Sequence, residues 1–350
     1  NLSIGLLQCG VSTQYIWEFK MNIKEQVLKQ LEANRGSYLS GKALADSLFY
    51  SRNAVWKAVH SLIKDGHKIG AVTNKGYCLL EEDGVLSKAS IEKYLIGDAS
   101  SFQVEVYREV TSTNNMMKRY AEEGRPEGVV IAADSQTMGK GRSKRSFYSP
   151  SDTGIYFSLL LRPEGSAREA LFITTAAAAA VSEGIEKVTG KKTGIKWVND
   201  IIYKGRKTAG ILTEASVDVE TGGLSYAVLG IGINVSDPKG GFPPEIQDIA
   251  GSLFGAETCA GAVRSRLVGE IISVFMGYYK NLSKKEYMET YRNRSVVIGK
   301  QVEAYSGNDC RIVRVLSIDD NGVLIAETED HEEIRMNSGE IRIRQIQEGQ

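Results

Sequence analysis

Residues 128–161 read GVVIAADSQTMGKGRSKRSFYSPSDTGIYFSLLL. An apolar run, residues 128–133, leads into a polar loop at residues 134–150, and a second apolar run, residues 155–161, follows it. The loop holds two glycines and four cations, Lys140, Arg142, Lys144 and Arg145. Glycine lets backbone N–H groups turn toward an anion, and Lys and Arg supply positive charge. Two interpretations follow, a basic surface loop or a loop that grips an anion over an active site.

The segments around this loop predict the fold of a central region, residues 84–295. Strand-like runs recur as hairpins with helical patterns to one side, which is typical of an α+β domain. We expect a mixed, mostly antiparallel sheet. Its strands are predicted at residues 102–107, 154–161, 194–197, 207–214 and 225–232, with a long helix at residues 168–188.

Composition sets broad limits on the protein. The chain has 350 residues, enough for two or three domains, with 42% apolar and 25% charged residues, which is typical of globular proteins. No apolar stretch is long enough to span a membrane, and residues 1–20, a tail of uncertain status, lack a signal-peptide pattern. The four cysteines are scattered without a C-x-x-C pair. We therefore expect a cytoplasmic protein without a zinc site or a disulfide framework, and metal ligands stay unknown.

The central region lacks the common signatures of nucleotide enzymes. It has no G-x-x-x-x-G-K-[ST] loop and no G-x-G-x-x-G at a strand-to-helix corner. The three histidines of the chain, His60, His67 and His331, lie outside it, which excludes a histidine-based acid–base mechanism there. Chemistry must come from Lys, Arg, Asp and backbone groups, which favours phosphoryl or adenylyl transfer, because charge stabilisation dominates those reactions.

Residues 21–80 form a separate basic head. Between residues 22 and 80, nine Lys/Arg stand against four Asp/Glu, a net charge of +5. Three short helical patterns, the second and third with Ser40 and Ser51 as caps, precede two strand-like pieces joined by residues 73–75. This order predicts a winged helix-turn-helix.

The third helix of the head would enter the major groove of DNA by its N-terminal end, and the wing would reach an adjacent backbone or groove. The alternative is a protein-docking module. A palindromic target would require a dimer. The residues expected to contact DNA are Ser51, Arg52, Asn53, Lys57, Asn74 and Lys75.

Residues 296–350 alternate as short strands around a tight turn at residues 319–322. We expect a small SH3-like β-barrel, either a cap that stabilises the large domain or a functional module. Upstream, Ser112, Thr113 and Asn114 stand at a strand-to-helix corner. They could be a helix N-cap, or they could hold a neutral polar ligand, because together they offer both donors and acceptors.

Four motifs in this order carry a resemblance to a known family. They are Ser112-Thr113-Asn114; Gln136 with Gly139-Lys140-Gly141-Arg142 and Arg145; Lys196-Trp197-Val198-Asn199-Asp200; and Lys207 with Ala209-Gly210-Ile211-Leu212 and Gly230-Ile231-Gly232-Ile233-Asn234. The set resembles the biotin–protein ligases, over residues 22–345. With the winged helix in front, the chain is similar to the bifunctional form, the biotin operon repressor.

The resemblance implies a reaction and its partners. Biotin and ATP, with Mg²⁺, would give biotinyl-5′-adenylate, which then acylates a lysine of the biotin carboxyl carrier protein of acetyl-CoA carboxylase or a related carboxylase. The adenylate would also act as corepressor by promoting a homodimer that binds operator DNA. Two alternatives stay open: a lipoate–protein ligase, which shares the catalytic fold, and a non-catalytic biotin-sensing repressor.

The resemblance also implies residue roles. Biotin would contact Ser112, Thr113, Asn114, Gln136, Lys140, Gly141, Arg142, Lys207 and Gly210. ATP or the adenylate would contact Arg142, Arg145, Phe147, Asn199, Lys207 and Asn234. Catalysis would rest on Lys207, Arg142 and Asp200. These roles agree with the chemistry, since a carboxylate that attacks an α-phosphate brings two anions together and needs cations at the meeting point.

The chain departs from the family pattern at four positions. Lys140 replaces an arginine, Lys144 a glycine, Phe147 a tryptophan and Val198 a proline. Lysine keeps the charge of arginine but loses its planar fork. None of the four changes removes a group that the chemistry needs; they bear on loop ordering and on the adenine contact.

Overall fold

The computed structural model describes residues 22–163, 169–218, 223–257, 262–306, 309–337 and 340–343. The expected tail at residues 1–20 and the Ser338-Gly339 pair lie outside them. The chain divides into two compact units, residues 1–93 with 260–262, and residues 94–259 with 263–350. None of the described helices is long and apolar enough to cross a membrane.

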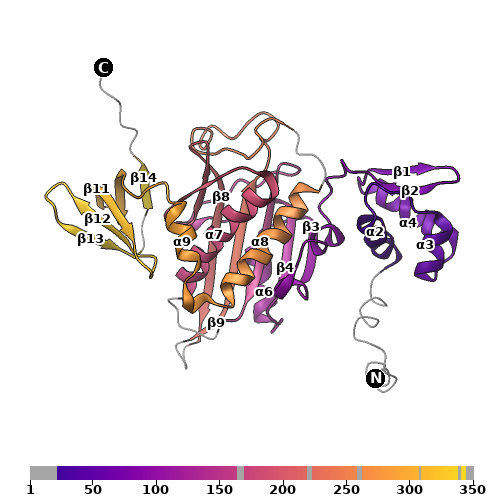
Figure 1. Ribbon diagram of the computed structural model, residues 1–350, viewed down its shortest axis with the longest axis horizontal. Coiled ribbons are helices and arrows are strands. Elements are labelled where there is room, and N and C mark those ends of the chain that lie inside the picture. Colours follow the sequence, from indigo (N-terminus) through magenta and orange to yellow (C-terminus); the bar gives the residue numbers. More distant parts are fainter. Residues whose placement is uncertain are drawn as a thin grey trace. The chain divides into compact units, whose positions relative to one another are not determined.

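The first unit begins as a winged helix-turn-helix, as predicted (Figure 1). Its elements are α2 (Ile23–Ala33), α3 (Gly41–Leu48), α4 (Arg52–Lys64) and the hairpin of β1 (Ile69–Val72) with β2 (Gly76–Leu79). The side chains of Asn22, Ser40 and Ser51 each accept a hydrogen bond from the backbone N–H three residues on, at 3.0, 3.0 and 3.1 Å. These caps satisfy N–H groups that a helix leaves open at its start.

The acidic segment at residues 81–84, which follows the predicted head, lies within this first unit. Asp83 is buried; its carboxylate accepts from the Lys68 N–H at 2.8 Å and lies 3.1 Å from Nδ1 of His67. The short helix α5 (Lys88–Glu92) follows and packs its Ala89 into the core of the head. An acidic residue outside any helical or strand pattern is expected to be exposed to solvent. Here the Lys68 N–H and His67 offset the cost of burying the Asp83 carboxylate.

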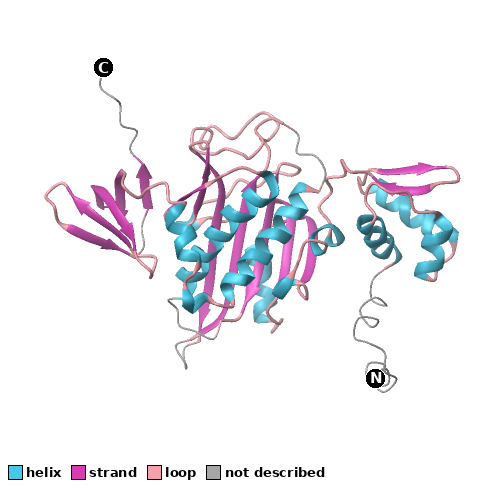
Figure 2. Ribbon diagram, in the orientation of Figure 1, coloured by secondary structure: helices cyan, strands magenta, loops and turns pink. Residues whose placement is uncertain are grey.

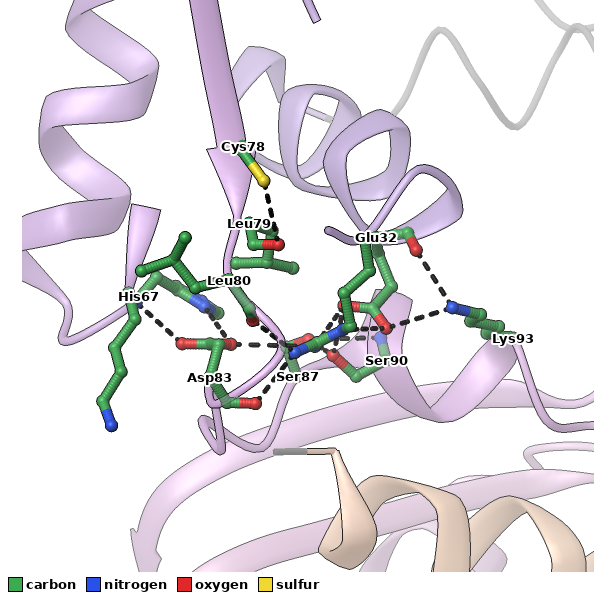
Figure 3. A network of polar contacts seen from close by, with 11 residues as sticks. Glu32, His67, Cys78, Leu79, Leu80, Asp83, Ser87, Ser90 and Lys93 are labelled. Carbon is green, nitrogen blue, oxygen red and sulfur yellow. Dashed lines mark hydrogen bonds and ion pairs between the residues drawn. The ribbon is translucent and has the colours of Figure 1, made fainter. Parts of the chain in front are cut away.

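A buried polar network ties α2 to this segment (Figure 3). Arg35 donates to both carboxylate oxygens of Glu32, at 3.2 and 2.6 Å, and to the carbonyls of Leu80 and Asp83, both at 3.0 Å. Figure 3 shows Ser90 and Lys93 also pointing toward Glu32. Because each charge is paired and hydrogen-bonded, the network fixes the segment after the wing without leaving an isolated charge inside.

We expect Glu32→Ala to lower the free energy of unfolding of the head by about 3–5 kcal/mol, because it leaves the buried Arg35 guanidinium without its charge partner. Urea denaturation measures this change. Asp65→Ala is the control, since the Lys24–Asp65 pair is exposed and should contribute less than about 1 kcal/mol. Equal effects of the two substitutions would contradict a structural role for the buried network.

The second unit is built on a seven-stranded sheet with the order β3-β4-β5-β9-β8-β7-β6. The strands are β3 (Gln103–Val110), β4 (Val129–Gln136), β5 (Gly154–Leu161), β6 (Gly194–Lys196), β7 (Asp200–Tyr203), β8 (Arg206–Val217) and β9 (Leu224–Asn234). The β3–β4 pair is parallel and all other pairs are antiparallel. The predicted mixed, mostly antiparallel sheet is therefore confirmed.

Helices cover both faces of this sheet. Val129 and Ile131 of β4 pack with Met117 of α6 (Thr113–Glu122). Successive side chains of a strand point to opposite faces, so the buried Val130 faces away from α6. Two helices, α7 (Glu169–Thr189) and α8 (Val263–Tyr279), run side by side across the sheet (Figures 1 and 2). All eight residues of β5 are buried as a result.

The C-terminal region is a small antiparallel sheet that follows the short helix α9 (Tyr287–Asn293). Its strands are β10 (Gln301–Ser306), β11 (Asp309–Ile318), β12 (Leu324–Thr328), β13 (Glu333–Met336) and β14 (Glu340–Ile343), in the order β13-β12-β11-β10-β14. The last strand pairs with the first, as expected for an SH3-like module. No pairing between the outer strands β13 and β14 occurs among the described residues, so closure of the predicted barrel is not observed.

Candidate functional site

A polar corner forms where β3 leads into α6. Ser112 is the N-cap of α6, and Gln136, at the end of β4, accepts from Thr113 N–H at 2.9 Å and from Thr113 Oγ1 at 3.2 Å. Ser158 Oγ lies 2.8 Å from Thr113 Oγ1 and 2.6 Å from Asn114 Oδ1. A hydroxyl has one proton, so Ser158 donates to only one of these oxygens at a time. The corner is therefore a connected network in which one Ser158 proton can serve either of two acceptors.

The orientation of Asn114 is set from both sides of its amide. Its Nδ2 donates to Glu214 at 2.8 Å, and its Oδ1 faces Ser158. Lys118 holds the same carboxylate, 2.5 Å away. Burial alone would raise the pKa of Glu214, but the hydrogen bonds from Lys118 and Asn114 outweigh it and leave the pKa below its ordinary value. Glu214 is thus ionised at neutral pH and keeps the amide nitrogen of Asn114 turned toward itself.

The basic loop folds back on itself as a small hairpin. Gly141 N–H donates to Arg145 O at 2.7 Å, and Phe147 N–H donates to Gly139 O at 2.9 Å. Ser143 and Lys144 occupy the left-handed region, with φ of 53° and 61°. Glycine adopts this conformation without a steric cost, which gives a physical reason for glycine at the Lys144 position in the family pattern.

The base of the loop is anchored to the sheet. The carboxylate of Asp134 accepts from Asp152 N–H at 3.2 Å and pairs with the buried Arg264 of α8. Tyr156 OH donates to Pro150 O at 3.0 Å. Burial raises the pKa of Tyr156, so this phenol stays a neutral donor. Both ends of the loop are therefore fixed, while its hairpin tip carries the cations.

Two predicted cations are held by one short motif. Arg142 Nη1 donates to Asn199 Oδ1 at 3.1 Å, and Lys207 Nζ lies 2.6 Å from Asp200 Oδ1. Asn199 is itself fixed, because its Nδ2 donates to the carbonyl of Ile211 at 2.7 Å. Neighbouring residues of the β6–β7 corner thus bring a loop cation and a strand cation to the same edge of the sheet.

Phe147 covers a floor of glycines. Gly210 of β8 and Gly232 of β9 are cross-strand partners, and a Cβ on either would lie 3.1 or 2.6 Å from the Phe147 ring. A Cβ on Gly210 would also lie 3.2 Å from Cε of Lys207. Asn234 ends β9, and its Nδ2 donates to the Gly251 carbonyl at 3.1 Å. The ring, the glycines and Lys207 therefore share one side of the sheet.

A cavity of about 700 Å³ opens beside the loop, between it and residues 243–246. Gln136 and Phe147 are the predicted site residues that line it, together with Ser149. The described residues contain no group of three or more His, Cys, Asp or Glu placed to hold a metal ion. The site offers cations and amides to a ligand.

The residues expected to contact DNA are all exposed. Arg52, Asn53 and Lys57 are exposed on α4, and Asn74 and Lys75 are exposed in the turn between β1 and β2. Ser51 is exposed as well, although its side chain caps α4. This helix also presents Trp56, stacked on His60 with 3.9 Å between ring centroids.

Three polar residues of the site were not predicted from sequence. They are Ser158, Glu214 and Lys118, which hold Thr113 and Asn114. One signal was available, because Ser158 interrupts the run of aliphatic and aromatic side chains in β5. A serine that is fully buried in a core strand needs a hydrogen-bond partner.

Known protein families match both units of the chain. The family described as Biotin/lipoate A/B protein ligase matches residues 106–234, and an HTH domain family matches residues 24–78. The bifunctional ligase/repressor BirA of Bacillus subtilis is 33% identical over 316 residues, 89% of this chain and 96% of that protein. The chain belongs to the BirA family of bifunctional biotin ligase/repressors.

Other BirA relatives extend the comparison. The biotin–[acetyl-CoA-carboxylase] ligase of Mycobacterium tuberculosis is 30% identical and aligns with 68% of this chain and 89% of its own length. The structure of the biotin protein ligase of Aquifex aeolicus, in complex with biotin and ATP, superposes with a TM-score of 0.58 at 27% identity. It covers 69% of this chain and 98% of that protein. The BirA fold of the second unit is therefore supported by both sequence and structure.

We expect Gly230→Ala to destabilise the second unit by about 1–3 kcal/mol, as for other overpacked sites. A Cβ at this position would lie 2.1 Å from Asn114 Oδ1, so the amide would have to move away from Ser158. Gly277→Ala is the control, because a Cβ there meets nothing within 4 Å in a helix, and alanine should stabilise α8 by about 0.5–1 kcal/mol. Thermal or urea unfolding distinguishes the two; a neutral Gly230→Ala would show that the corner tolerates displacement.

Proposed function

We propose that the chain joins biotin to ATP at this site, giving biotinyl-5′-adenylate, and transfers biotin to a lysine of a biotin carboxyl carrier protein. The observation that carries this proposal is the pair of cations held by Asn199 and Asp200 at the same edge of the sheet. Lys207 and Arg142 would stand where the biotin carboxylate meets the α-phosphate. Both anions can approach there only if positive charge offsets their repulsion.

The polar corner suits the ureido ring of biotin. That ring carries two N–H donors and one carbonyl acceptor, and the corner offers hydroxyl, amide and backbone partners in Ser112, Thr113, Asn114 and Gln136. Burial strengthens such hydrogen bonds, since competing water is removed. Because Glu214 and Ser158 hold the Asn114 amide, the ring would meet a preformed arrangement that needs little reordering.

In the first step, a carboxylate oxygen of biotin attacks the α-phosphorus of ATP. A new P–O bond forms as the bond to the β,γ-diphosphate breaks, and pyrophosphate leaves. Lys207, paired with Asp200, and Arg142 stabilise the charge that builds on the α-phosphate, and Arg145 adds to the positive field of the loop. The Mg²⁺ would enter as part of the MgATP substrate, because it is bound chiefly through the phosphates in such sites.

Phe147 and Asn234 would mark the adenine side. Phe147 lies over the Gly210–Gly232 floor and lines the cavity beside the loop, so an adenine ring could stack on or beside it. Lys140 and Gly141 belong to the hairpin tip that would close over the adenylate. An ordered loop excludes water, which otherwise hydrolyses an acyl-adenylate.

In the second step, the ε-amine of a carrier lysine attacks the acyl carbon of the adenylate. An amide bond forms, the bond to the phosphate oxygen breaks, and AMP leaves with that oxygen. We propose the carrier of acetyl-CoA carboxylase as substrate because relatives are named for that enzyme. The first step needs only charge stabilisation and positioning, which the histidine-free site can supply. In the second step the attacking amine also loses a proton, which passes to solvent as the amide forms.

Lys207→Ala should lower the rate of biotinyl-adenylate formation by at least roughly 100-fold, because it removes a cation from the developing charge. Pyrophosphate release with biotin and MgATP measures this step. Lys204→Ala, in the exposed turn between β7 and β8, should leave the rate unchanged.

The same assay with an apo-carrier tests the function itself. Parallel reactions receive biotin or lipoate, and transfer to the carrier lysine is measured. Transfer of lipoate in preference to biotin would favour a lipoate–protein ligase. Biotin binding without transfer would leave a biotin-sensing repressor that lacks ligase activity.

We further propose that the head represses transcription by binding operator DNA as a homodimer in the cytoplasm, with biotinyl-adenylate as corepressor. The exposed surface of α4 and the β1–β2 turn carries Arg52, Asn53, Lys57 and Lys75, which suits a major-groove contact flanked by phosphate contacts. A two-fold dimer would match the two halves of a palindrome.

Lys57→Ala should reduce the slope of the logarithm of the DNA-binding constant against the logarithm of the salt concentration by about 1, as expected for the loss of one phosphate contact. The probe is a DNA fragment from the control region of the biotin genes of the same organism, with and without biotin and MgATP. Lys29→Ala on α2, exposed outside the recognition helix, is the control. Affinity that does not rise with biotin and MgATP would contradict the corepressor role.

A further inference from the structure

The turn between β11 and β12 of the C-terminal sheet contacts the β6–β7 corner of the large sheet. Trp197, which is 3% exposed, donates from its indole Nε1 to the carbonyl of Gly322 at 2.9 Å. The two residues are 125 positions apart in the sequence. This hydrogen bond therefore joins the C-terminal module directly to the motif that holds the two site cations.

The turn that supplies this carbonyl is rigid. Asp319 closes it, since its carboxylate accepts from the N–H groups of Asn321 and Val323 at 2.8 and 3.0 Å. Gly322 N–H donates to the carbonyl of Asp319 at 3.0 Å, and Gly322 has a φ of 73°, which glycine adopts most readily. The Gly322 carbonyl is thus a fixed acceptor rather than part of a mobile tip.

The large domain also grips this turn from α9 and the segment before it. Arg292 donates to Asp320 at 2.8 Å and to the carbonyl of Ile318 at 3.3 Å. Lys285 donates to Asn321 at 2.9 Å and lies over the ring of Phe172, 4.7 Å from its centroid. Several contacts from different elements therefore place the turn, not the indole alone.

A second buried donor acts on the same corner. Tyr291 of α9 donates from its hydroxyl to the carbonyl of Val198 at 3.0 Å. Burial raises the pKa of Tyr291, so the phenol remains protonated and remains a donor. Adjacent residues of the motif, Trp197 and Val198, are thus each fixed by one hydrogen bond from outside the large sheet.

We infer that Trp197 is a positioning residue, through which the Asp319–Gly322 turn sets the geometry of the ligase site. Asn199 and Asp200 follow directly, and they hold Arg142 and Lys207. A displacement of Trp197 by a fraction of an ångström would pass to both cations, because the intervening backbone is short and held at each end. The inference rests on the proposed function, because its test measures biotinyl-adenylate formation. The contacts that fix Trp197 and Val198 do not depend on that proposal.

Trp197→Phe tests the inference in the full-length protein, since it removes the N–H donor and keeps an aromatic ring. We expect the kcat of biotinyl-adenylate formation to fall between roughly 10- and 100-fold, the range that follows from misplaced reacting groups. The KM values for biotin and MgATP should change less than about 3-fold, because among the described residues the indole donates to Gly322 and not to the polar corner or the loop hairpin. Tyr291→Phe should lower kcat in the same way.

Tyr287→Phe is the matched control. Tyr287 is also a buried tyrosine of α9, but its hydroxyl faces Thr175 of α7, at 3.4 Å, rather than the motif. It should lower thermal stability as Tyr291→Phe does and leave kcat at the parent value. The comparison of Tyr287→Phe with Tyr291→Phe therefore distinguishes an effect on the position of the motif from a general loss of stability.

The outcomes are distinct. Parent-like kcat in folded Trp197→Phe and Tyr291→Phe overturns the inference, as does a kcat loss in Tyr287→Phe equal to theirs. If Trp197→Phe does not fold, the Tyr291 and Tyr287 pair decides by the same criterion. A parent protein that forms no biotinyl-adenylate would instead overturn the proposed function, which pyrophosphate release shows before any variant is compared.

Discussion

Charge neutralisation at one edge of the large sheet is the constraint on which the second unit depends. The proposed adenylation brings two anions together, and each nearby cation has a partner that holds it in place. Asn199 does this for Arg142 with a neutral amide, whereas Asp200 does it for Lys207 with a carboxylate. The amide leaves the full guanidinium charge available, and the carboxylate holds the Lys207 ammonium in place. The loop, the β6–β7 corner and the C-terminal turn all converge on this arrangement.

The first unit also depends on paired charges, which here stabilise its fold. Its helices are short, so packing and capping must supply most of their stability. The paired Glu32 and Arg35, with Ser90 and Asp83, extend the head past the wing by fixing the next helix to it. The head therefore includes α5, and the first unit extends to Lys93.

Local signals in the sequence predicted much of this molecule. Caps at Ser40, Ser51 and Ser112 and the alternation of the strands identify the elements, and the ordered motifs identify the family. Contacts between distant residues could not be predicted. Glu214 reaches Asn114 across 100 positions, and Trp197 reaches Gly322 across 125. Helix α8 escaped prediction because it is apolar on most sides, and a helix buried all round lacks a clear 3.6-residue pattern.

The glycine floor under Phe147 has an evolutionary consequence. On β9, Gly230 and Gly232 face the site, where Asn114 and Phe147 lie against them, while Ile231 and Ile233 face the core. Glycine is the smallest residue, so any substitution at Gly230 or Gly232 would add atoms on the site face and reduce the space for a ligand. A relative that accepts a bulkier acyl group must therefore gain room in the loops around the sheet. Within this family, acyl specificity should diversify in the loops, while β8 and β9 stay unchanged.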